Sequence, residues 1–268
     1  TGRTEVLDIM QARLLNQVPI VNCDGQLVGL HLLHALLGQE ELANWAVVMA
    51  GGKGTRLRPI TENIPKPMVK VAGRPILERI ILHLVSYGIR SVFISINHLG
   101  HVIEEYFGNG EQFGCNIQYL RENECLGTGG SLSLLPSTPS EPVLVMNGDL
   151  VMQTNFAAML KFHHNGQYYA TMGLRPYTHE VAFGCAEVDN NQLVKLEEKP
   201  VLQKYVNAGV YVLSPEAISA VPQQTFFQIT NLFEGAIQSG RPCGAYLIEE
   251  DWEDIGYPHQ LRKANGLT

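Results

Sequence analysis

The stretch that decides the fold is Ala50-Gly-Gly-Lys-Gly-Thr-Arg-Leu-Arg-Pro-Ile-Thr-Glu-Asn-Ile-Pro-Lys-Pro67. The apolar run Trp45 to Met49 precedes it and predicts a buried strand. Three glycines, Gly51, Gly52 and Gly54, then fall where the chain turns sharply into the next element. Glycine at such a turn lets backbone N–H groups approach an anion closely. The stretch therefore predicts a phosphate-binding loop that follows a strand.

The loop fits neither of the two common phosphate-loop patterns. A Walker A loop requires Gly, four residues and then Gly-Lys-Ser/Thr, whereas Lys53 directly follows Gly52 here and precedes Gly54. The dinucleotide pattern G-x-G-x-x-G fails as well, because Leu57 occupies the place of its last glycine. We therefore expect phosphate binding of a third kind.

Composition predicts one large α/β domain with a small appendage, since the chain has 268 residues and is 45% hydrophobic. We expect no membrane span and no signal peptide. The cysteines are odd in number and form no C-x-x-C pair, which indicates free thiols in a reducing cytoplasm rather than a disulfide framework or zinc site. The histidine pairs, which are expected at the surface or at helix ends, are His31/His34, His98/His101 and His163/His164.

Charge argues against general binding of nucleic acid, because the net charge is -7. A basic run nevertheless follows the glycines, and Glu62 is its only acid. Its members are Lys53, Arg56, Arg58, Lys66, Lys70 and Arg74. A solvated face is the plain explanation for any one of these lysines. Beside the glycines, the run favours a compact polyphosphate ligand.

Strand and helix signals alternate after the loop. Pro75 to Gly88 predicts a helix, with Pro near its start and Gly at its stop. Pro142 to Asp149 predicts a buried strand that ends in polar residues. Strands predicted from residue 170 onward, with few helices among them, indicate added mixed sheet. This pattern indicates a parallel sheet covered by helices, with Gly51 and Asp149 at the carboxyl ends of its strands, where ligands bind.

Six segments together resemble the sugar-1-phosphate nucleotidyltransferase family. They are the loop from Gly51 to Pro59, Pro65-Lys66-Pro67, Asn147-Gly148-Asp149, Glu197-Glu-Lys-Pro200, Asn207-Ala-Gly and Asp254-Ile-Gly. The resemblance implies a Rossmann-like, doubly wound mixed α/β sheet. It also implies an enzyme that joins a nucleoside triphosphate (NTP) to a sugar 1-phosphate and releases pyrophosphate, for cell-surface glycan synthesis.

The resemblance also implies roles for individual residues. The catalytic residues would be Arg56, Lys66 and Asp149. The nucleotide would contact Ala50, Gly51, Gly52, Lys53, Gly54, Thr55, Arg56, Gly127, Thr128 and Gly148. The sugar phosphate would contact Gly184, Glu197, Lys199 and Asn207. Mg²⁺ would be held by Asp149 and Asp254.

The proposed chemistry needs no Ser-His-Asp triad, because a sugar phosphate is already an anionic nucleophile, its second pKa being about 6. Such a site must instead align two anions and neutralise their charge with Lys, Arg and a divalent cation. Alternatives remain for single residues. Lys66 could be an exposed loop charge, although its flanking prolines stiffen the backbone. Asp149 and Asp254 could be loop carboxylates or helix caps.

The segment Leu126-Gly-Thr-Gly-Gly130 resembles guanylyltransferases, which indicates GTP as the nucleotide. Backbone groups at Gly127 and the Thr128 hydroxyl could contact a base edge. Alternatively, Thr128 could cap the helix that follows.

Residues 1–41 resemble the later part of a CBS (cystathionine β-synthase-type) module, and residues 42–268 form the predicted transferase domain. The expected elements of the first segment are a helix from Glu5, strands near Val18 and Gln26 joined by a turn at Asp24-Gly25, and a helix from His31 to Leu37. Only one incomplete copy is present, so we expect the chain to begin inside a longer natural protein. The segment is expected to serve packing or dimer contacts.

The combination resembles CBS-linked guanylyltransferases, such as glucosamine-1-phosphate guanylyltransferases. Two hypotheses follow: an active nucleotidyltransferase, and a non-catalytic protein on the same fold that senses a nucleotide or sugar phosphate. A homo-oligomer is possible for the enzyme. Retention of Arg56, Lys66, Asp149, Lys199 and Asp254 favours the enzyme, since a sensor would not need every charge.

Overall fold

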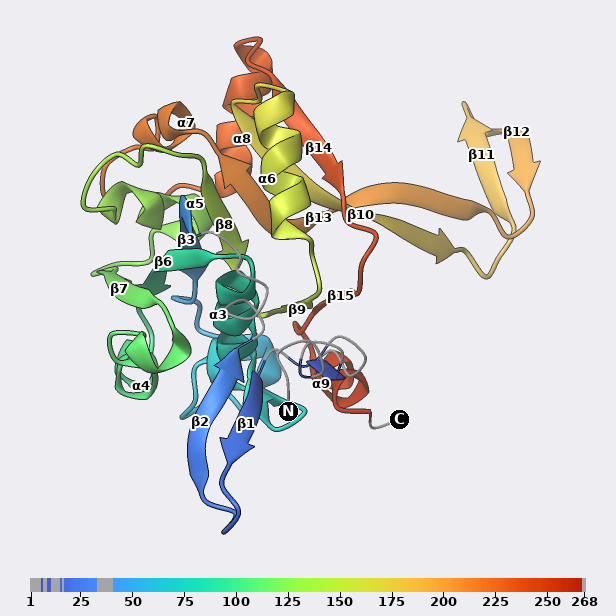
Figure 1. Cartoon of the computed structure of the whole chain (residues 1–268). Helices are drawn as coiled ribbons and strands as arrows, with labels where there is room; N and C mark the ends of the chain where they lie inside the picture. The colour runs from blue at the N-terminus through green and yellow to red at the C-terminus, as the bar shows by residue number, and fades with distance from the viewer. Residues whose placement is uncertain (1–5, 7–8, 11–14, 16, 33–40, 267–268) are drawn as a thin grey trace.

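A seven-stranded sheet forms the centre of the computed structural model, which describes residues 6, 9–10, 15, 17–32 and 41–266 (Figure 1). Its strands, in spatial order, are β14 (Cys243–Leu247), β10 (Ala170–Glu180), β13 (Val201–Leu213), β8 (Val143–Asn147), β3 (Leu42–Met49), β6 (Ile89–Ile96) and β7 (Asn116–Arg121). The four strands from β8 to β7 are parallel, and β13 runs antiparallel to both of its neighbours. The sheet is therefore mixed and mainly parallel, as expected.

Both faces of the parallel strands are buried. Val47 and Val48 are adjacent in β3 and fully buried, yet they belong to the hydrophobic cores on opposite sides of the sheet. Because successive side chains point to opposite faces, a strand covered on both sides needs an unbroken apolar run, and this explains the sequence from Ala46 to Met49. The helices are α3 (Ile76–Ser86), α4 (Gly100–Phe107), α5 (Gly127–Gly130), α6 (Phe156–Asn165), α7 (Pro215–Ser219), α8 (Ile229–Gln238) and α9 (Pro258–Ala264). Of these, α3, α4 and α6 contribute buried side chains to one core, and α7 and α8 to the other.

Short elements fill the connections between these strands and helices. The 3-10 turns are η1 (Thr55–Leu57), η2 (Lys66–Met68), η3 (Glu111–Phe113) and η4 (Ser131–Leu134). Two-stranded pairs are formed by β4 (Lys70–Val71) with β5 (Arg74–Pro75), and by β9 (Leu150–Met152) with β15 (Trp252–Asp254). The second pair carries part of the candidate site.

A long ribbon leaves the sheet on one side. Strands β10 and β13 continue together beyond their other partners and lead into a hairpin of β11 (Cys185–Asp189) and β12 (Gln192–Glu197). Figure 1 shows this hairpin far from the helices that cover the sheet. The sequence predicted these strands but did not predict that they would project.

Most of the described part of the N-terminal segment is an antiparallel hairpin of β1 (Gln17–Val21) and β2 (Leu27–Leu32), and Val6, Ile9 and Met10 are helical, in agreement with the helix expected from Glu5. This confirms the two strands and the turn at Asp24-Gly25. The helix expected from His31 was wrong at its start, because His31 and Leu32 lie in β2 and pair with β1. The rest of that helix, and most of the helix expected from Glu5, lie outside the described residues.

Helix α6 was not predicted. It begins after Asn155, whose side chain accepts a hydrogen bond from the Ala158 N–H at 3.0 Å and so caps the helix. Its buried stripe is Phe156, Met159 and His163. A histidine in the third of these positions interrupts the apolar pattern. His163 lies in the last turn of α6, as one of the two expected alternatives had it, but it is 3% exposed and so does not lie at the surface.

The pKa of His163 generates a prediction about stability. Burial, and next the charge of His164, lower this pKa from 6.5 to about 4, while a ring nitrogen shares a hydrogen bond with the Thr171 hydroxyl at 2.8 Å. The unfolded chain therefore takes up a proton near pH 6.5 that the folded protein takes up only near pH 4. Neutral His163 therefore does not reduce the free energy of unfolding above pH 6.5. As the pH falls from 6.5 towards 4, the free energy of unfolding decreases by about 3 kcal/mol because of this group.

We expect His163→Gln to flatten the fall in the free energy of unfolding between pH 6.5 and pH 4. Urea denaturation at several pH values measures this slope. His164→Gln is the matched control, since His164 is exposed, and it should keep most of the wild-type slope. Equal slopes in both variants and the wild type would show that His163 is not the titrating group.

Candidate active site

The glycine-rich loop begins at the carboxyl end of β3. There Ala50 donates its N–H to the Ser95 carbonyl at 2.9 Å, and Gly148 donates to the Met49 carbonyl at 2.9 Å. The loop and the turn after β8 therefore lie side by side, because β3 and β8 are parallel neighbours that end at the same level. A Cβ on Gly148 would meet the Met49 carbonyl oxygen at 2.9 Å, so only glycine fits this contact.

The loop folds back over Lys66. Gly54 has a φ of 60°, and a Cβ there would stand 3.1 Å from the Cβ of Lys66. The buried Thr61 hydroxyl donates to the Gly54 carbonyl at 2.7 Å and closes this turn. Gly52 has open space where a Cβ would be, and Lys53, Thr55 and Arg56 are exposed. The loop thus presents free backbone and basic side chains above a half-buried lysine.

Lys66 joins two carboxylates. Its ammonium makes an ion pair with Asp149 Oδ2 and lies 3.8 Å from Asp254 Oδ1. The Lys66 side chain is only 16% exposed, so the alternative of a solvated loop charge is wrong. Asp149 and Asp254, predicted from distant segments, are brought together by this lysine.

The pairing of β9 with β15 explains the proximity of the two aspartates. Asp254 lies opposite Leu150, and Ile255 donates its N–H to the Asp149 carbonyl at 3.1 Å. The Trp252 indole donates to the Ala208 carbonyl at 2.8 Å and so ties β15 to β13. Neither β9 nor this tryptophan contact was predicted, since a three-residue strand gives almost no periodic signal.

The environment of Asp254 holds its proton more tightly than usual. Burial raises the pKa of this carboxyl, and the Asp149 carboxylate raises it further, while Lys66 and Arg56 pull it down. Arg56 in turn lies over the Tyr257 ring, with its guanidinium carbon 5.6 Å from the ring centroid. Two negative and two positive side chains therefore share one small region.

The donor set of this region fits a divalent cation. Asp149 Oδ1 and Asp254 Oδ1 are both buried and have no hydrogen-bond partner within the described part of the chain. Over the same residues, no third acid, histidine or cysteine joins them as a complete ligand cluster. Mg²⁺ binds in just this way, through one or two carboxylates, with substrate phosphates completing its shell.

Glu122 organises the neighbouring edge of the site. Its carboxylate accepts hydrogen bonds from the Ser95 hydroxyl and, at 2.9 Å, from the Leu126 N–H. A Cβ on Gly51 would fall 3.0 Å from the same carboxylate, so a side chain there would crowd it. Glu122 was not predicted from the sequence, where its one signal is its position directly after β7.

Gly127 and Thr128 lie against the start of α8. Gly127 has a φ of 76°, and the Thr128 hydroxyl donates to Gln228 Oε1 at 2.8 Å and accepts from the Ile229 N–H at 3.0 Å. The alternative that Thr128 caps its own helix is therefore wrong, because its hydroxyl binds the first turn of α8 instead. Contact between these residues and a base stays a prediction.

The residues expected at the sugar phosphate lie in two separate places in the structure. Asn207 lies near the end of β8, where its side chain accepts the Gly209 N–H at 2.9 Å and Gly209 packs against Asn147. Gly184, Glu197 and Lys199 are exposed and belong to the projecting β11–β12 hairpin and its connections. The structure does not bring these three to Lys66.

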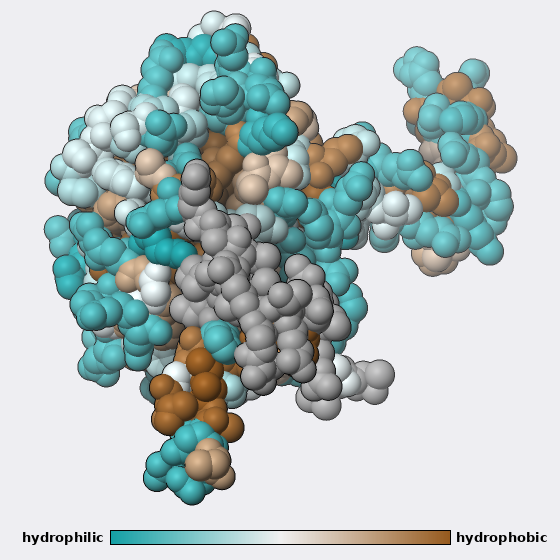
Figure 2. Space-filling view, viewed as in Figure 1, coloured by the Kyte–Doolittle hydropathy of each residue, from teal (hydrophilic) through white to brown (hydrophobic). Residues whose placement is uncertain are grey.

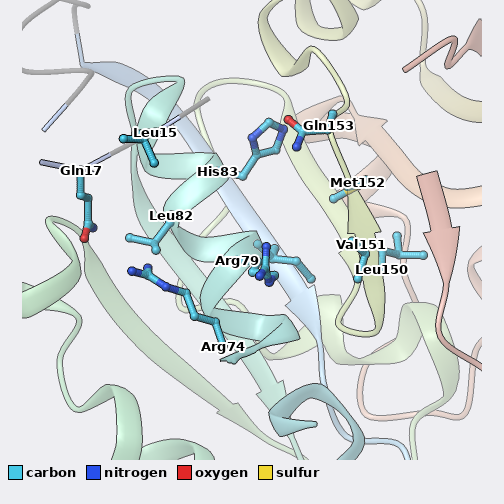
Figure 3. Close-up of a pocket in the computed structure, with 11 residues that line it drawn as sticks. Leu15, Gln17, Arg74, Arg79, Leu82, His83, Leu150, Val151, Met152 and Gln153 are labelled. Carbon is cyan, nitrogen blue, oxygen red and sulfur yellow. The ribbon is translucent and has the colours of Figure 1, made fainter. Parts of the chain in front are cut away.

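A cavity of about 310 Å³ lies behind β9, between this strand and α3 (Figure 3). Arg74, Arg79 and His83 line one side, and Val151 and Gln153 line the other. Neither Asp149 nor Lys66 takes part in its lining. It is therefore separate from the candidate site.

Comparison with known proteins identifies the family. The sequence profile described as "Nucleotidyl transferase" matches residues 45–268. The chain belongs to this family. The family match begins within β3 and covers every residue of the Lys66, Asp149 and Asp254 cluster. The CBS-like interpretation of residues 1–41 stays a prediction.

The relatives of this chain include transferases named for different nucleotides. It is 33% identical to a mannose-1-phosphate guanylyltransferase of Mycobacterium tuberculosis, covering 81% of this chain and 62% of the relative. It is 29% identical to a UTP–glucose-1-phosphate uridylyltransferase of Synechocystis, covering 79% of this chain and 60% of the relative. The chain thus spans about three-fifths of the length of these curated relatives.

A crystal structure of HddC from Yersinia pseudotuberculosis, complexed with GMP-PN, has the same fold. It superposes with a TM-score of 0.62 at 24% identity and covers 83% of this chain and 98% of its own. This likeness confirms the Rossmann-like sheet expected from the sequence.

The charges around Asp254 predict that two substitutions shift its pKa in opposite directions. Asp149→Asn should lower the pKa of Asp254, because it removes a neighbouring negative charge. Lys66→Met should raise this pKa, because the ammonium favours the charged carboxylate. Carboxyl-carbon NMR titration of labelled aspartate measures both. Asp251→Asn, at an exposed position, is the control and should leave the Asp254 titration unchanged. Shifts of the same sign would contradict this electrostatic account.

Proposed function

We propose that this protein transfers a nucleotidyl group from an NTP to a sugar 1-phosphate and releases pyrophosphate, with GTP as the preferred nucleotide. The observation that carries the proposal is the ion cluster of Lys66, Asp149 and Asp254 beside the glycine-rich loop. Membership of the nucleotidyl transferase family supports the reaction class. The names of the relatives, which join a nucleotide to a hexose 1-phosphate, support the substrate class.

The residues of the cluster would act on the phosphates. An oxygen of the sugar phosphate attacks the α-phosphorus, the new P–O bond forms, and the bond to the β-phosphate breaks with departure of pyrophosphate. No general base is required, because the attacking oxygen is already ionised near neutral pH. Lys66 and Arg56 would neutralise the phosphate oxygens, and backbone N–H groups of the glycine-rich loop would orient the triphosphate.

Asp149 and Asp254 would hold Mg²⁺ through their buried Oδ1 atoms, which accept no hydrogen bond within the described part of the chain. When bound, the ion supplies charge neutralisation at the reacting phosphate. Lys66 keeps the two carboxylates from repelling one another and from repelling the substrate.

The guanine preference rests on the Leu126-Gly-Thr-Gly-Gly130 segment and on guanylyltransferases among the relatives, although a uridylyltransferase is among them too. We further propose that residues 1–41 form a unit apart from the transferase domain at 42–268. The five cysteines, all in the described part of the chain, are free thiols, which agrees with a cytoplasmic setting. No helix of the described residues is long and apolar enough to cross a bilayer.

A substrate grid tests the reaction and the nucleotide. Pyrophosphate release is measured with GTP, UTP, dTTP, CTP and ATP, each against the 1-phosphates of mannose, glucose and glucosamine. We expect GTP to give the highest kcat/KM with at least one sugar. A preference for another nucleotide would remove the guanine assignment alone. Absence of turnover in every pair would favour the sensor hypothesis instead.

Metal dependence is tested with substitutions at the two aspartates. Activity should vanish in excess EDTA and return with Mg²⁺. Asp149→Asn and Asp254→Asn should each lower kcat by orders of magnitude, because the amide keeps the shape but loses the charge that fixes the ion. Both variants should stay folded by circular dichroism, since each loses one of two like charges. Asp251→Asn is the control, and near-wild-type turnover of Asp149→Asn would overturn the metal assignment.

A further inference from the structure

The cavity between α3 and β9 takes no part in the candidate active site. Its volume of about 310 Å³ is at the lower end of small-molecule sites. Leu15 and Gln17 of the N-terminal segment line it together with residues of α3 and β9. Figure 3 shows Arg79 between α3 and β9, with His83 and Gln153 close together at one end. A molecule in this cavity would therefore touch both the N-terminal segment and the transferase domain.

Two arginines line the cavity, and no acid is among the described residues that line it. Arg79 donates to the carbonyl oxygens of Val71 at 2.9 Å and Ala72 at 3.4 Å. Burial lowers the pKa of Arg79, and the nearby charge of Arg74 lowers it further. The two guanidinium groups therefore repel one another, and a bound anion would offset that repulsion.

Glu78 neutralises one of the two guanidinium groups. One of its carboxylate oxygens accepts a hydrogen bond from Arg74 at 3.1 Å, and the other accepts from the Tyr106 hydroxyl at 2.7 Å. Its charge also raises the pKa of Arg79, but by less than burial lowers it. Within the described part of the chain, Arg79 forms no ion pair of its own and keeps only its backbone partners.

The other acids near β9 are engaged elsewhere. Glu250 accepts the Asn155 N–H at 3.2 Å at the start of α6, where a helix favours negative charge. Glu253, which lies opposite Val151, pairs with Lys263 at 3.1 Å. The two aspartates of the candidate active site share the charges of a lysine and an arginine. The cavity therefore keeps an unneutralised positive charge.

His83 adds a neutral hydrogen-bond acceptor to the same cavity. Burial lowers the pKa of His83, and the Thr154 carbonyl and the charge of Glu250 offset this only in part. His83 Nε2 lies 2.9 Å from the Thr154 carbonyl oxygen. Because a carbonyl oxygen only accepts, Nε2 carries the proton and Nδ1 is left to accept from a ligand. The Gln153 amide supplies a further donor and acceptor.

We propose that this cavity binds a small phosphate monoester that carries hydroxyl groups, such as a pentose phosphate. Its phosphate, with a charge of about -1.5 to -2 near neutral pH, lies against Arg74 and Arg79. Its hydroxyl groups bond to His83 Nδ1 and to the Gln153 amide. The bound molecule connects the N-terminal segment to α3 and β9. The proposal does not rest on the proposed function, because none of these residues belongs to the candidate active site.

Calorimetric titration with ribose 5-phosphate tests the site in full chains that carry Lys66→Met, which removes a cation from the candidate active site. This chain should bind, and adding Arg74→Gln should weaken binding about tenfold, because a charge-assisted hydrogen bond is lost. Adding Arg121→Gln is the matched control, since Arg121 is also an arginine in an ion pair, with Glu104 at 2.6 Å, and should leave the affinity unchanged. No binding to Lys66→Met, or equal affinities of the two double variants, would overturn the proposal.

A substitution at Gln153 tests recognition of the hydroxyl groups. In the Lys66→Met chain, Gln153→Leu should weaken binding of ribose 5-phosphate about fivefold, because one hydrogen bond is lost. Inorganic phosphate, which has no pentose, should bind with and without this substitution alike. An unchanged affinity for ribose 5-phosphate would show that the pentose is not recognised and would overturn the assigned ligand class.

Hydrogen exchange locates the bound molecule without any substitution. Ribose 5-phosphate should slow exchange in β1, α3 and β9 of the wild-type chain, and leave α8, which belongs to the other core, unchanged. Slowing confined to the glycine-rich loop would place the molecule in the candidate active site and overturn the proposal. These measurements need no turnover, so they decide the cavity even if every substrate pair proves inactive.

Discussion

The ion cluster of Lys66, Asp149 and Asp254 is the constraint on which the site depends. The Asp149 carboxylate raises the pKa of Asp254, so the two carboxylates repel one another unless a cation stands between them. Lys66 supplies that charge from the loop that follows β3. The glycine-rich loop, the end of β8 and the β15 segment are thereby held at one place, although they lie far apart in the sequence.

The sheet makes this convergence possible. Parallel strands bring their carboxyl ends to one edge, so Ala50 and Gly148 lie side by side without any contact specific to the chemistry. Glycines at Gly51 and Gly148 permit approaches that a side chain would block. The same sheet extends on its other side into the projecting ribbon of β10 and β13, whose apolar side chains are exposed (Figure 2). The same strands, β10 and β13, therefore have buried side chains within the sheet and exposed apolar side chains where they extend beyond it.

Much of the fold was predictable because its signals are local. Helix α3 was confirmed from its apolar spacing and its Pro and Gly boundaries, and β3 and β8 from their apolar runs. Helix α6 was missed because His163 occupies a core position of its stripe. That position depends on burial and on the Thr171 hydroxyl, neither of which a sequence pattern records. The short β9 gave no periodic signal.

The sequence by itself determined the loop, the basic run and the residue types suited to a phosphate and a cation. Backbone freedom at glycine and the charge of a side chain belong to the residue, so they can be inferred without coordinates. Only the tertiary structure decided that Lys66 lies between Asp149 and Asp254, and that Glu197 and Lys199 belong to the projecting β11–β12 hairpin and its connections. Distances between segments remote in sequence depend on strand order and pairing, which arise from packing of the whole chain rather than from any one stretch.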